Sequence, residues 1–383
     1  MKKFLSVILI LILNTPLLPF FNSSLAYDNK DISALQKIYN HNITVLNHWD
    51  LSNPDEIEEV EWQCINDIYR LVSMDLGGID ISGKIDLSEF EYIKYYKFSN
   101  TSINEIILPE CLNSIPQHAF YSCSNLEYIN IPQSINSIEK SSFKNCSNLK
   151  SVVLNNSNTS ISSETFSGCI SLECIVNSNN ITYVGRNAFF NCNNLVFYDN
   201  DAPNTYINNY IQKLNYPFSN YENSGLTGYA TIITGNQESD NYKYPYKFGI
   251  AYLYDENNNL LQQTNLNNDG KFSFNNLSIG YKYKLVIDGK FAIARDYYFI
   301  LTQRDFTIST KEKAFSIIAC DFNSDGIISQ TDIKSFFQGM DNPLSEDAYL
   351  YDINGDGYIN ISDTSLLYSI INYSDKIIYK TQG

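Results

Sequence analysis

Residues 115–132 read IPQHAFYSCSNLEYINIP, and this pattern returns three more times at a fixed interval. Each copy places a cysteine 23 residues after the previous one, and three further columns keep the same step. The columns are Cys123, Cys146, Cys169 and Cys192; Phe120, Phe143, Phe166 and Phe189; Leu126, Leu149, Leu172 and Leu195; and Ile115, Ile138, Ile161 and Val184. A fixed period of this length predicts a solenoid, because one turn buries its apolar side only against neighbouring turns.

The repeat resembles the leucine-rich repeat of the BspA-like class, over about residues 100–200. The resemblance implies a short strand in LEYINI, with Leu126, Ile129 and Ile131 facing the core. The alternating side chains then face the concave side, where repeat proteins bind ligands. We expect the ligand face to comprise Tyr128, Asn130, Ser151 and Val153, on a strip that also holds Glu105, Ile107, Cys174, Val176 and Phe197.

The flanks of the repeats differ from the repeats, as expected of segments that hide an open core from water. Residues 27–100 resemble the helical N-terminal cap of leucine-rich repeat proteins, and we expect Trp49 and Trp62 to pack over the first coil. Residues 203–218 predict a closing helix with an aromatic plug, so the solenoid and its C-terminal cap span 101–220.

Residues 226–312 change to a period of two, in runs such as FGIAYLYDE and YKYKLVID, with turn signals at DENNN and NNDG. Such alternation predicts a small antiparallel β-sandwich. The run beginning at Thr264 resembles the carboxypeptidase-regulatory-like family, and this resemblance implies a module that serves as a spacer.

Two acidic loops near the end of the chain, DFNSDGIISQTD and DINGDGYINISD, have the spacing of calcium loops. In such loops, oxygen ligands stand at positions 1, 3, 5, 7, 9 and 12, and glycine at position 6 allows the sharp turn. The first set is Asp321, Asn323, Asp325, Ile327 (carbonyl), Ser329 and Asp332; the second is Asp352, Asn354, Asp356, Tyr358 (carbonyl), Asn360 and Asp363.

Charge also favours calcium over a pair of Asx-rich turns on a solvated surface. Residues 320–375 hold ten acids and one base, a net charge of −9 that two Ca²⁺ ions reduce to −5. We therefore expect calcium as the cofactor, as two ions.

Paired loops with Asp at position 12, each followed by an apolar helix, resemble the type I dockerin over residues 318–375. The resemblance implies an all-α module that binds a cohesin domain of a scaffoldin and so joins a cellulosome. It places the partner-reading residues at loop positions 10 and 11, which are Gln330, Thr331, Ile361 and Ser362.

Residues 1–26 predict a secretory signal peptide, with Lys2 and Lys3 before an apolar run and small residues at Ser24 and Ala26. No later apolar run is long enough to span a membrane. Without the two lysines, the formal charge falls from −16 to −18, which disfavours nucleic acid as a partner. We expect an extracellular protein, held at the cell surface through a cellulosome.

The fold class is thus a multidomain chain: an α/β leucine-rich-repeat solenoid, a small antiparallel β-sandwich and an all-α dockerin. These modules leave no room for a catalytic domain, and His118 before Cys123 is a variable position rather than a catalytic base. We expect no catalytic residues and a binding adaptor for an unknown protein or glycan, in a polysaccharide-degradation setting. The alternative is a cellulosomal hydrolase with its active site on the concave face. The sequence leaves open whether four further cysteines form disulfides: Cys64, Cys111, Cys174 and Cys320.

Overall fold

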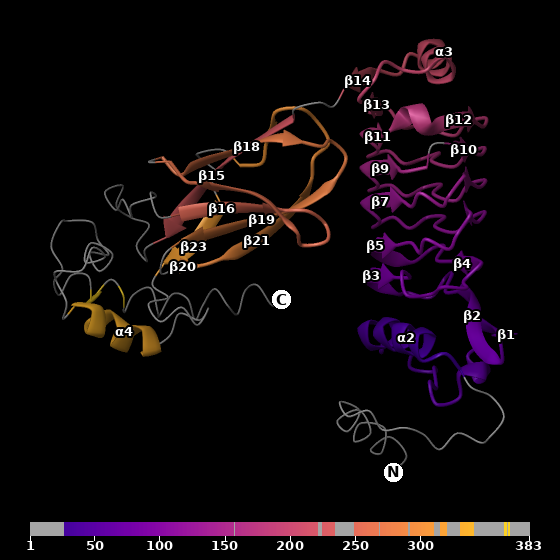
Figure 1. The fold of residues 1–383 in the computed structure, drawn as a ribbon, viewed down its shortest axis with the longest axis horizontal. Helices are drawn as coiled ribbons and strands as arrows, with labels where there is room; N and C mark the ends of the chain where they lie inside the picture. The colour runs from indigo at the N-terminus through magenta and orange to yellow at the C-terminus, as the bar shows by residue number, and fades with distance from the viewer. Residues whose placement is uncertain are drawn as a thin grey trace.

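The computed structural model describes residues 27–156, 158–220, 224–233, 249–267, 269–289, 292–309, 315–319, 330–340, 364–365 and 367. A solenoid of stacked coils runs from the N-terminal cap to helix α3 (Figure 1). A β-sandwich lies beside the side of the coils that carries β7, β9 and β11, and helix α4 follows the sandwich in the chain (Figure 1).

The solenoid consists of coils whose strands form parallel sheets on two sides. On the side that faces the sandwich, one sheet holds β7 (Tyr128–Ile131), β9 (Ser151–Leu154), β11 (Cys174–Val176), β13 (Val196–Asp199) and β14 (Phe218–Asn220). Before it, β3 (Ser82–Asp86) pairs in parallel with β5 (Ser102–Ile107). The other side holds β6 (Ser114–Ile115), β8 (Ser137–Ile138), β10 (Thr159–Ile161) and β12 (Ile181–Val184), with the short helix η2 at Ser178–Asn180. The predicted solenoid is therefore present.

The repeated phenylalanines form a continuous ladder through the core. The ring centroids of Phe120 and Phe143 lie 5.1 Å apart, and the next two pairs lie 5.3 and 5.4 Å apart, all with nearly parallel planes. Phe98 extends the ladder by one coil, at 6.0 Å from Phe120. Because every ring is buried and stacked, each coil is fixed in register with the next.

The repeated cysteines are buried free thiols that each donate to the preceding coil. Cys146 Sγ donates to the carbonyl of Phe120 at 3.0 Å, and Cys169 Sγ donates to that of Phe143 at 3.1 Å. Cys123 and Cys192 repeat the contact one coil before and one coil after. The buried position beside the preceding coil accepts a small side chain with a weak hydrogen-bond donor, which explains why cysteine recurs every 23 residues.

Two columns of residues at the coil corners have positive φ. One column contains His118 at 60°, Ser141, Glu164 at 58° and Asn187; the other contains Ser122, Asn145, Gly168 and Asn191. The side chain in the His118 column changes from coil to coil because the backbone turn, rather than a side-chain contact, is what recurs. The variability of position 118 is thus explained by local geometry.

The N-terminal cap contains one helix, α2 (Asn29–His41), the short helix η1 (Pro54–Glu56) and a sheet of β1 (Val60–Ile65), β2 (Ile68–Asp75) and β4 (Tyr95–Lys97). It is therefore less helical than expected, since only α2 is an α-helix among its described residues. Trp49 is buried in the core and Trp62 packs against it, as predicted.

The C-terminal cap is α3 (Thr205–Leu214), whose Ile207 and Ile211 are buried against the last coil. Tyr216 supplies the plug, since its ring lies 5.7 Å from that of Phe197 and its hydroxyl donates to the carbonyl of Phe189 at 2.9 Å. The closing helix and aromatic plug are as the sequence predicts.

The sandwich has two sheets with alternating burial. One holds β15 (Ser224–Ile233), β18 (Lys271–Leu277), β20 (Ala292–Ile293), β22 (Phe306–Thr307) and β23 (Phe315–Ala319). The other holds β16 (Gly249–Tyr254), β17 (Leu260–Asn265), β19 (Lys282–Gly289) and β21 (Arg295–Ile300). The sheets are mostly antiparallel, but β15 pairs in parallel with β22 and β23. Because β23 ends at Ala319, the sandwich extends past the expected boundary at 312.

Helix α4 (Gln330–Met340) is the described part of the C-terminal module. Phe336 in this helix and Leu367, from the segment after the second acidic loop, are both fully buried. The all-α architecture expected for residues 318–375 otherwise falls outside the described residues.

Candidate functional site

The concave face of the solenoid is covered by the sandwich, which corrects the expected ligand face. Tyr128, Ser151 and Val153 point outward from the coils as predicted, but they are at most 6% exposed. Tyr128 and Val153 belong to one apolar cluster with sandwich residues such as Ile279 and Leu301. An open ligand surface at these positions is therefore wrong.

Polar contacts reinforce this interface. Ser151 Oγ donates to the carbonyl of Gly280 at 2.6 Å, and Asn130 Nδ2 donates to Glu256 Oε1 at 2.8 Å. Tyr198 contributes a longer contact to the carbonyl of Thr302 at 3.4 Å. Asn130, the fourth residue of the expected face, is thus occupied by the sandwich as well.

Gly280 is the point of closest approach between the two modules. It lies in the turn between β18 and β19 at φ +86°, and a Cβ there would overlap Val176 on β11. A glycine is needed for both reasons, because an L side chain is strained at this φ and the space is already filled.

The register of the last coil also differs from the expectation for Phe197. Cys174 pairs with Val196, and Ile175 pairs with Phe197, so the step here is 22 residues rather than 23. As a result Phe197 faces the core, and Tyr198 takes the concave position.

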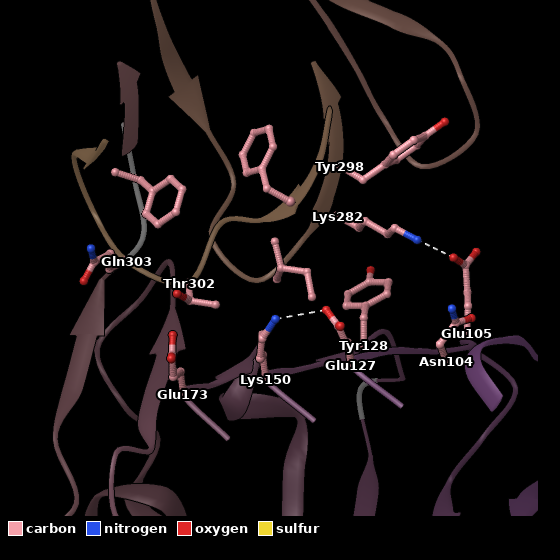
Figure 2. Close-up of a pocket in the computed structure, with 13 residues that line it drawn as sticks. Asn104, Glu105, Glu127, Tyr128, Lys150, Glu173, Lys282, Tyr298, Thr302 and Gln303 are labelled. Carbon is pink, nitrogen blue, oxygen red and sulfur yellow. Dashed lines mark hydrogen bonds and ion pairs between the residues drawn. The ribbon is translucent and has the colours of Figure 1, made fainter. Parts of the chain in front are cut away.

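An open cleft of about 660 Å³ remains where the sandwich leaves the edge of the concave face. One wall comes from β5, the start of β7 and the residues just before β7, β9 and β11, and the other comes from the start of β19, β21 and the segment after β21 (Figure 2). The lining consists of Asn104, Glu105, Glu127, Tyr128, Lys150, Glu173, Lys282, Tyr298, Phe299, Ile300, Thr302, Gln303 and Phe306.

Ion pairs neutralise most of the charge in this cleft. Lys150 Nζ lies 2.9 Å from Glu127 Oε2, and Lys282 of the sandwich pairs with Glu105 of the solenoid. Burial opposes ionisation of Glu105, but its hydrogen bonds with Lys282 and Lys84 prevail and hold its pKa below the ordinary value. Glu173, by contrast, has no ion pair among the described residues.

Tyr128 contributes a buried hydroxyl that is directed into the cleft (Figure 2). This hydroxyl makes no hydrogen bond of normal geometry within the described part of the chain, but the Glu256 carboxylate lies close enough to interact with it. Burial raises the pKa of Tyr128 well above its ordinary value, and the nearby Glu256 carboxylate acts in the same direction. An unsatisfied buried hydroxyl is costly, so a ligand group that bonds it would gain affinity.

Aromatic rings form the opposite wall. Tyr298 is 63% exposed at the mouth of the cleft, and Lys282 Nζ lies 5.7 Å from its ring centroid. Phe299 and Phe306 stack at 6.1 Å with an interplanar angle of 8°. The cleft thus combines an aromatic platform with carboxylate, amide and hydroxyl groups, a combination that suits binding of a polar ligand with apolar faces.

The predicted calcium ligands lie outside the described residues, apart from Asp332. Asp332 stands in the first turn of α4 and is fully buried. Gln330 and Thr331 form the start of the same helix, whereas Ile361 and Ser362 also lie outside the described part. Where the structure is described, no cluster of His, Cys, Asp and Glu suits a metal ion.

The cysteines do not form a nucleophilic site in the described structure. Burial raises the pKa of the Cys123 thiol, which donates to the carbonyl of Phe98 rather than facing His118. Cys64, Cys111 and Cys174 are free thiols, and burial raises the pKa of Cys174 to about 12. Cys320 lies outside the described residues.

Sequence reasoning missed the interface and the cleft, although one signal was present. Val153, Cys174 and Val176 are apolar at outward positions, where a solvated strip would carry polar side chains. An apolar outward strip predicts a covering partner, which here is the next module of the same chain.

Comparison with known proteins identifies the repeats. Residues 83–215 match the BspA type leucine-rich repeat region in six copies, in agreement with the stacked coils of the structure. The match begins at residue 83, and it therefore includes nearly all of β3 and also β4, which pairs with β2 of the cap. No protein of the curated set matches the chain.

Two kinds of solved structure show distant similarity. A type II cohesin–X–dockerin complex from Acetivibrio cellulolyticus, as an N-terminal interface mutant, matches at 17% identity over 38% of this chain and 93% of that chain, with a TM-score of 0.30. The C-terminal interface mutant of that complex matches at 16% identity with the same coverage and TM-score. A leucine-rich repeat protein of T. pallidum matches at 16% identity over 43% of this chain and 96% of that chain, with a TM-score of 0.25. In the described residues, no helix is long and apolar enough to cross a membrane.

Proposed function

We propose that this protein is a secreted, non-catalytic adaptor that attaches to a cohesin of a cellulosome scaffold through a calcium-dependent dockerin. Its leucine-rich repeats and sandwich together bind a ligand in the cleft that they share. The observation that carries the ligand part is the pairing of an unsatisfied Tyr128 hydroxyl with the exposed Tyr298 ring in one cleft.

The acidic loops support the attachment part through their donor chemistry. Each offers short oxygen side chains at the spacing that calcium requires, with Gly326 or Gly357 at the bend. The described start of α4 at Gln330 puts Asp332 in its first turn, as a position-12 ligand needs. Calcium supplies positive charge when bound, which favours the buried carboxylate of Asp332.

The cleft favours a neutral oligosaccharide over a peptide. A sugar ring offers an apolar face for Tyr298 and hydroxyls for Tyr128, Glu173, Asn104 and Gln303. The ion pairs of Glu105 and Glu127 leave little net charge to attract an ionic ligand. A cleft of about 660 Å³ is large enough for a short oligosaccharide.

Calcium titration of the whole protein tests the attachment. We expect two bound Ca²⁺ ions and calcium-dependent binding to a type I cohesin, both lost in Asp325→Ala with Asp356→Ala. Asp341→Ala with Asp347→Ala removes the same charge between the loops and serves as the control. Cohesin binding that persists in excess chelator would contradict the proposal.

Calorimetry with cellohexaose, xylohexaose and mannohexaose tests the cleft. Tyr298→Ala is expected to weaken binding, whereas Tyr95→Ala, at a tyrosine that is 40% exposed elsewhere, leaves it unchanged. Tyr128→Phe is expected to weaken binding by about tenfold while raising or preserving thermal stability, because it removes an unsatisfied hydroxyl. Binding of none of the three sugars, or equal affinity in all variants, would refute the ligand part.

Turnover of polysaccharide or casein by the purified protein would instead favour the hydrolase. That alternative has lost its expected location, since the concave face is covered.

A further inference from the structure

A second groove lies at the far end of the solenoid, between α3 and the corner of the last coil. Its volume is about 620 Å³. In Figure 1, α3 stands at the end of the stack beyond β12 and β13, away from the sandwich. The groove is therefore separate from the cleft.

Helix α3 builds one wall because it carries two stripes of large side chains. Ile207 and Ile211 form the buried stripe. Tyr206, Tyr210 and Lys213, spaced four and three residues apart, line the groove together with Leu214. The helix thus packs on the core with one stripe and leaves the other for a partner.

The groove is held in shape by the same residues that close the solenoid. Tyr206 Oη accepts a hydrogen bond from the backbone N–H of Val184 at 2.6 Å. Tyr210 and Tyr216 stack at 6.4 Å with an interplanar angle of 12°, next to Phe189. A preformed groove loses little conformational entropy when it binds a ligand.

Large apolar side chains are exposed along this groove. Phe190 is 57% exposed, Leu214 is 50% exposed and Tyr206 is 38% exposed. Single exposed apolar residues are ordinary, but a group that lines one concavity indicates an interaction surface.

The charge of the groove is opposite to that of the protein. Its lining contains Arg186 and Lys213 and no acidic residue, in a chain of formal net charge −16. Neither cation has a carboxylate within ion-pair distance among the described residues. Glu164 lies near enough to interact with Arg186 through charge, but it is ion-paired with Lys144. The groove thus offers two cations without a direct ion pair beside Phe190 and Leu214, where the cleft offers a nearly balanced set of charges.

We propose that this groove binds an acidic peptide segment of a partner protein. A large apolar side chain of the peptide packs between Phe190 and Leu214, and flanking carboxylates pair with Arg186 and Lys213. Leu214 argues for a peptide rather than an acidic sugar, because it adds an aliphatic surface beside the aromatic rings of the groove, and an apolar side chain of a peptide covers that surface without burying hydroxyls. The proposal is independent of the calcium loops and of the cleft.

The test uses the full-length protein and three fluorescent probes in anisotropy titrations. The probes are the random copolymer poly(Glu,Tyr), poly-Glu and polygalacturonate. We expect poly(Glu,Tyr) to bind about tenfold more tightly than poly-Glu, because only the copolymer supplies an apolar anchor. Binding of poly(Glu,Tyr) should weaken as salt rises.

Charge reversal separates a specific groove from general attraction. Arg186→Glu with Lys213→Glu is expected to weaken poly(Glu,Tyr) binding by about tenfold or more. Lys94→Glu with Lys271→Glu, at two exposed lysines elsewhere, makes the same change in net charge and should leave binding unchanged. Phe190→Ser with Leu214→Ser should remove the preference for the copolymer while retaining the salt dependence.

All three pairs of residues are exposed, so circular dichroism is expected to show unchanged folds. Three results would overturn the proposal: no binding of poly(Glu,Tyr), equal weakening by the control pair, or tighter binding of polygalacturonate. The last result would assign the groove to an acidic polysaccharide.

Discussion

Gly280→Ala is expected to open the interface between solenoid and sandwich. Gly280 meets β11 at φ +86°, and a Cβ there would overlap the side chain of Val176 and lie 3.1 Å from Ser151 Oγ. The overlap involves a side chain that is itself fully buried, so it has no free space into which to move. The two modules must therefore separate slightly for alanine to fit.

The magnitude has two parts. Alanine at a positive φ costs about 1–2 kcal/mol whether or not the modules are docked, because the turn itself is strained. Overpacking against Val176 adds about 1–3 kcal/mol, and this part falls on the docked state alone. The docking equilibrium should thus shift by about 5- to 150-fold.

Gly78→Ala is the matched control. Gly78 has φ +82°, almost the same as Gly280, but a Cβ there would meet no atom within 4 Å. The variant pays the cost of the backbone conformation without the overlap. The difference between the two variants therefore isolates the interface.

The labelling rate of Cys174 by iodoacetamide measures docking, followed by mass spectrometry of the peptides. Cys174 is buried in the interface, and burial raises the pKa of its thiol to about 12, so it labels only when the modules open. Cys64, which is exposed, gives the unprotected rate, and Cys146 in the core reports unfolding of the solenoid.

We expect Cys174 to label about 5- to 150-fold faster in Gly280→Ala than in Gly78→Ala. Cys146 should stay protected in both variants. Equal Cys174 rates in the two variants would refute the reasoning, because the overlap would then be relieved without undocking. Parallel labelling of Cys146 would show that the solenoid itself unfolds.

Three further outcomes are expected. Cys146→Ala should lower the free energy of unfolding by about 1–3 kcal/mol in urea, since it removes a buried side chain and its S–H···O bond, whereas exposed Cys64→Ala should not. The ion pairs of Glu105 lower the pKa of its carboxyl, so its contribution to docking is present above pH 4.5 and is lost as the pH falls through the lowered pKa. Small-angle scattering should show the two modules opening as the pH falls through that lowered pKa. Glu105→Gln should show no such pH dependence. Chelation, or Asp325→Ala with Asp356→Ala, should increase hydrogen exchange in residues 318–375 and leave the solenoid unchanged; uniform exchange across the chain would contradict this.

The repeat period was enough to predict the interior of the solenoid. Columns of Phe, Cys, Leu and Ile recur at one step, and an apolar residue that recurs in this way has to face neighbouring copies of itself. The same logic predicted the closing helix and plug, because the last coil exposes a core that something must cover. The sequence likewise predicted that Ile129 and Ile131 of β7, and Leu126 just before it, face the core, which the structure confirms.

The place of the ligand site was not predictable in this way. The outward residues Tyr128 and Val153 contact a module whose sequence begins about 70 to 100 residues later and shares no period with them. A strip of the same composition has the same local pattern whether it faces water or another domain. Only the docked structure shows that the face is covered and that the cleft at its edge stays open.

The sequence by itself therefore determined the stacking of the coils and the identity of their buried columns. Each of these follows from local periodicity, in which neighbouring residues decide what is buried. The tertiary structure decided which face the sandwich covers, the slip that turns Phe197 inward, and the gathering of Arg186 and Lys213 in one groove. These depend on contacts between segments far apart in the chain, where shape and packing, rather than spacing, select the partner.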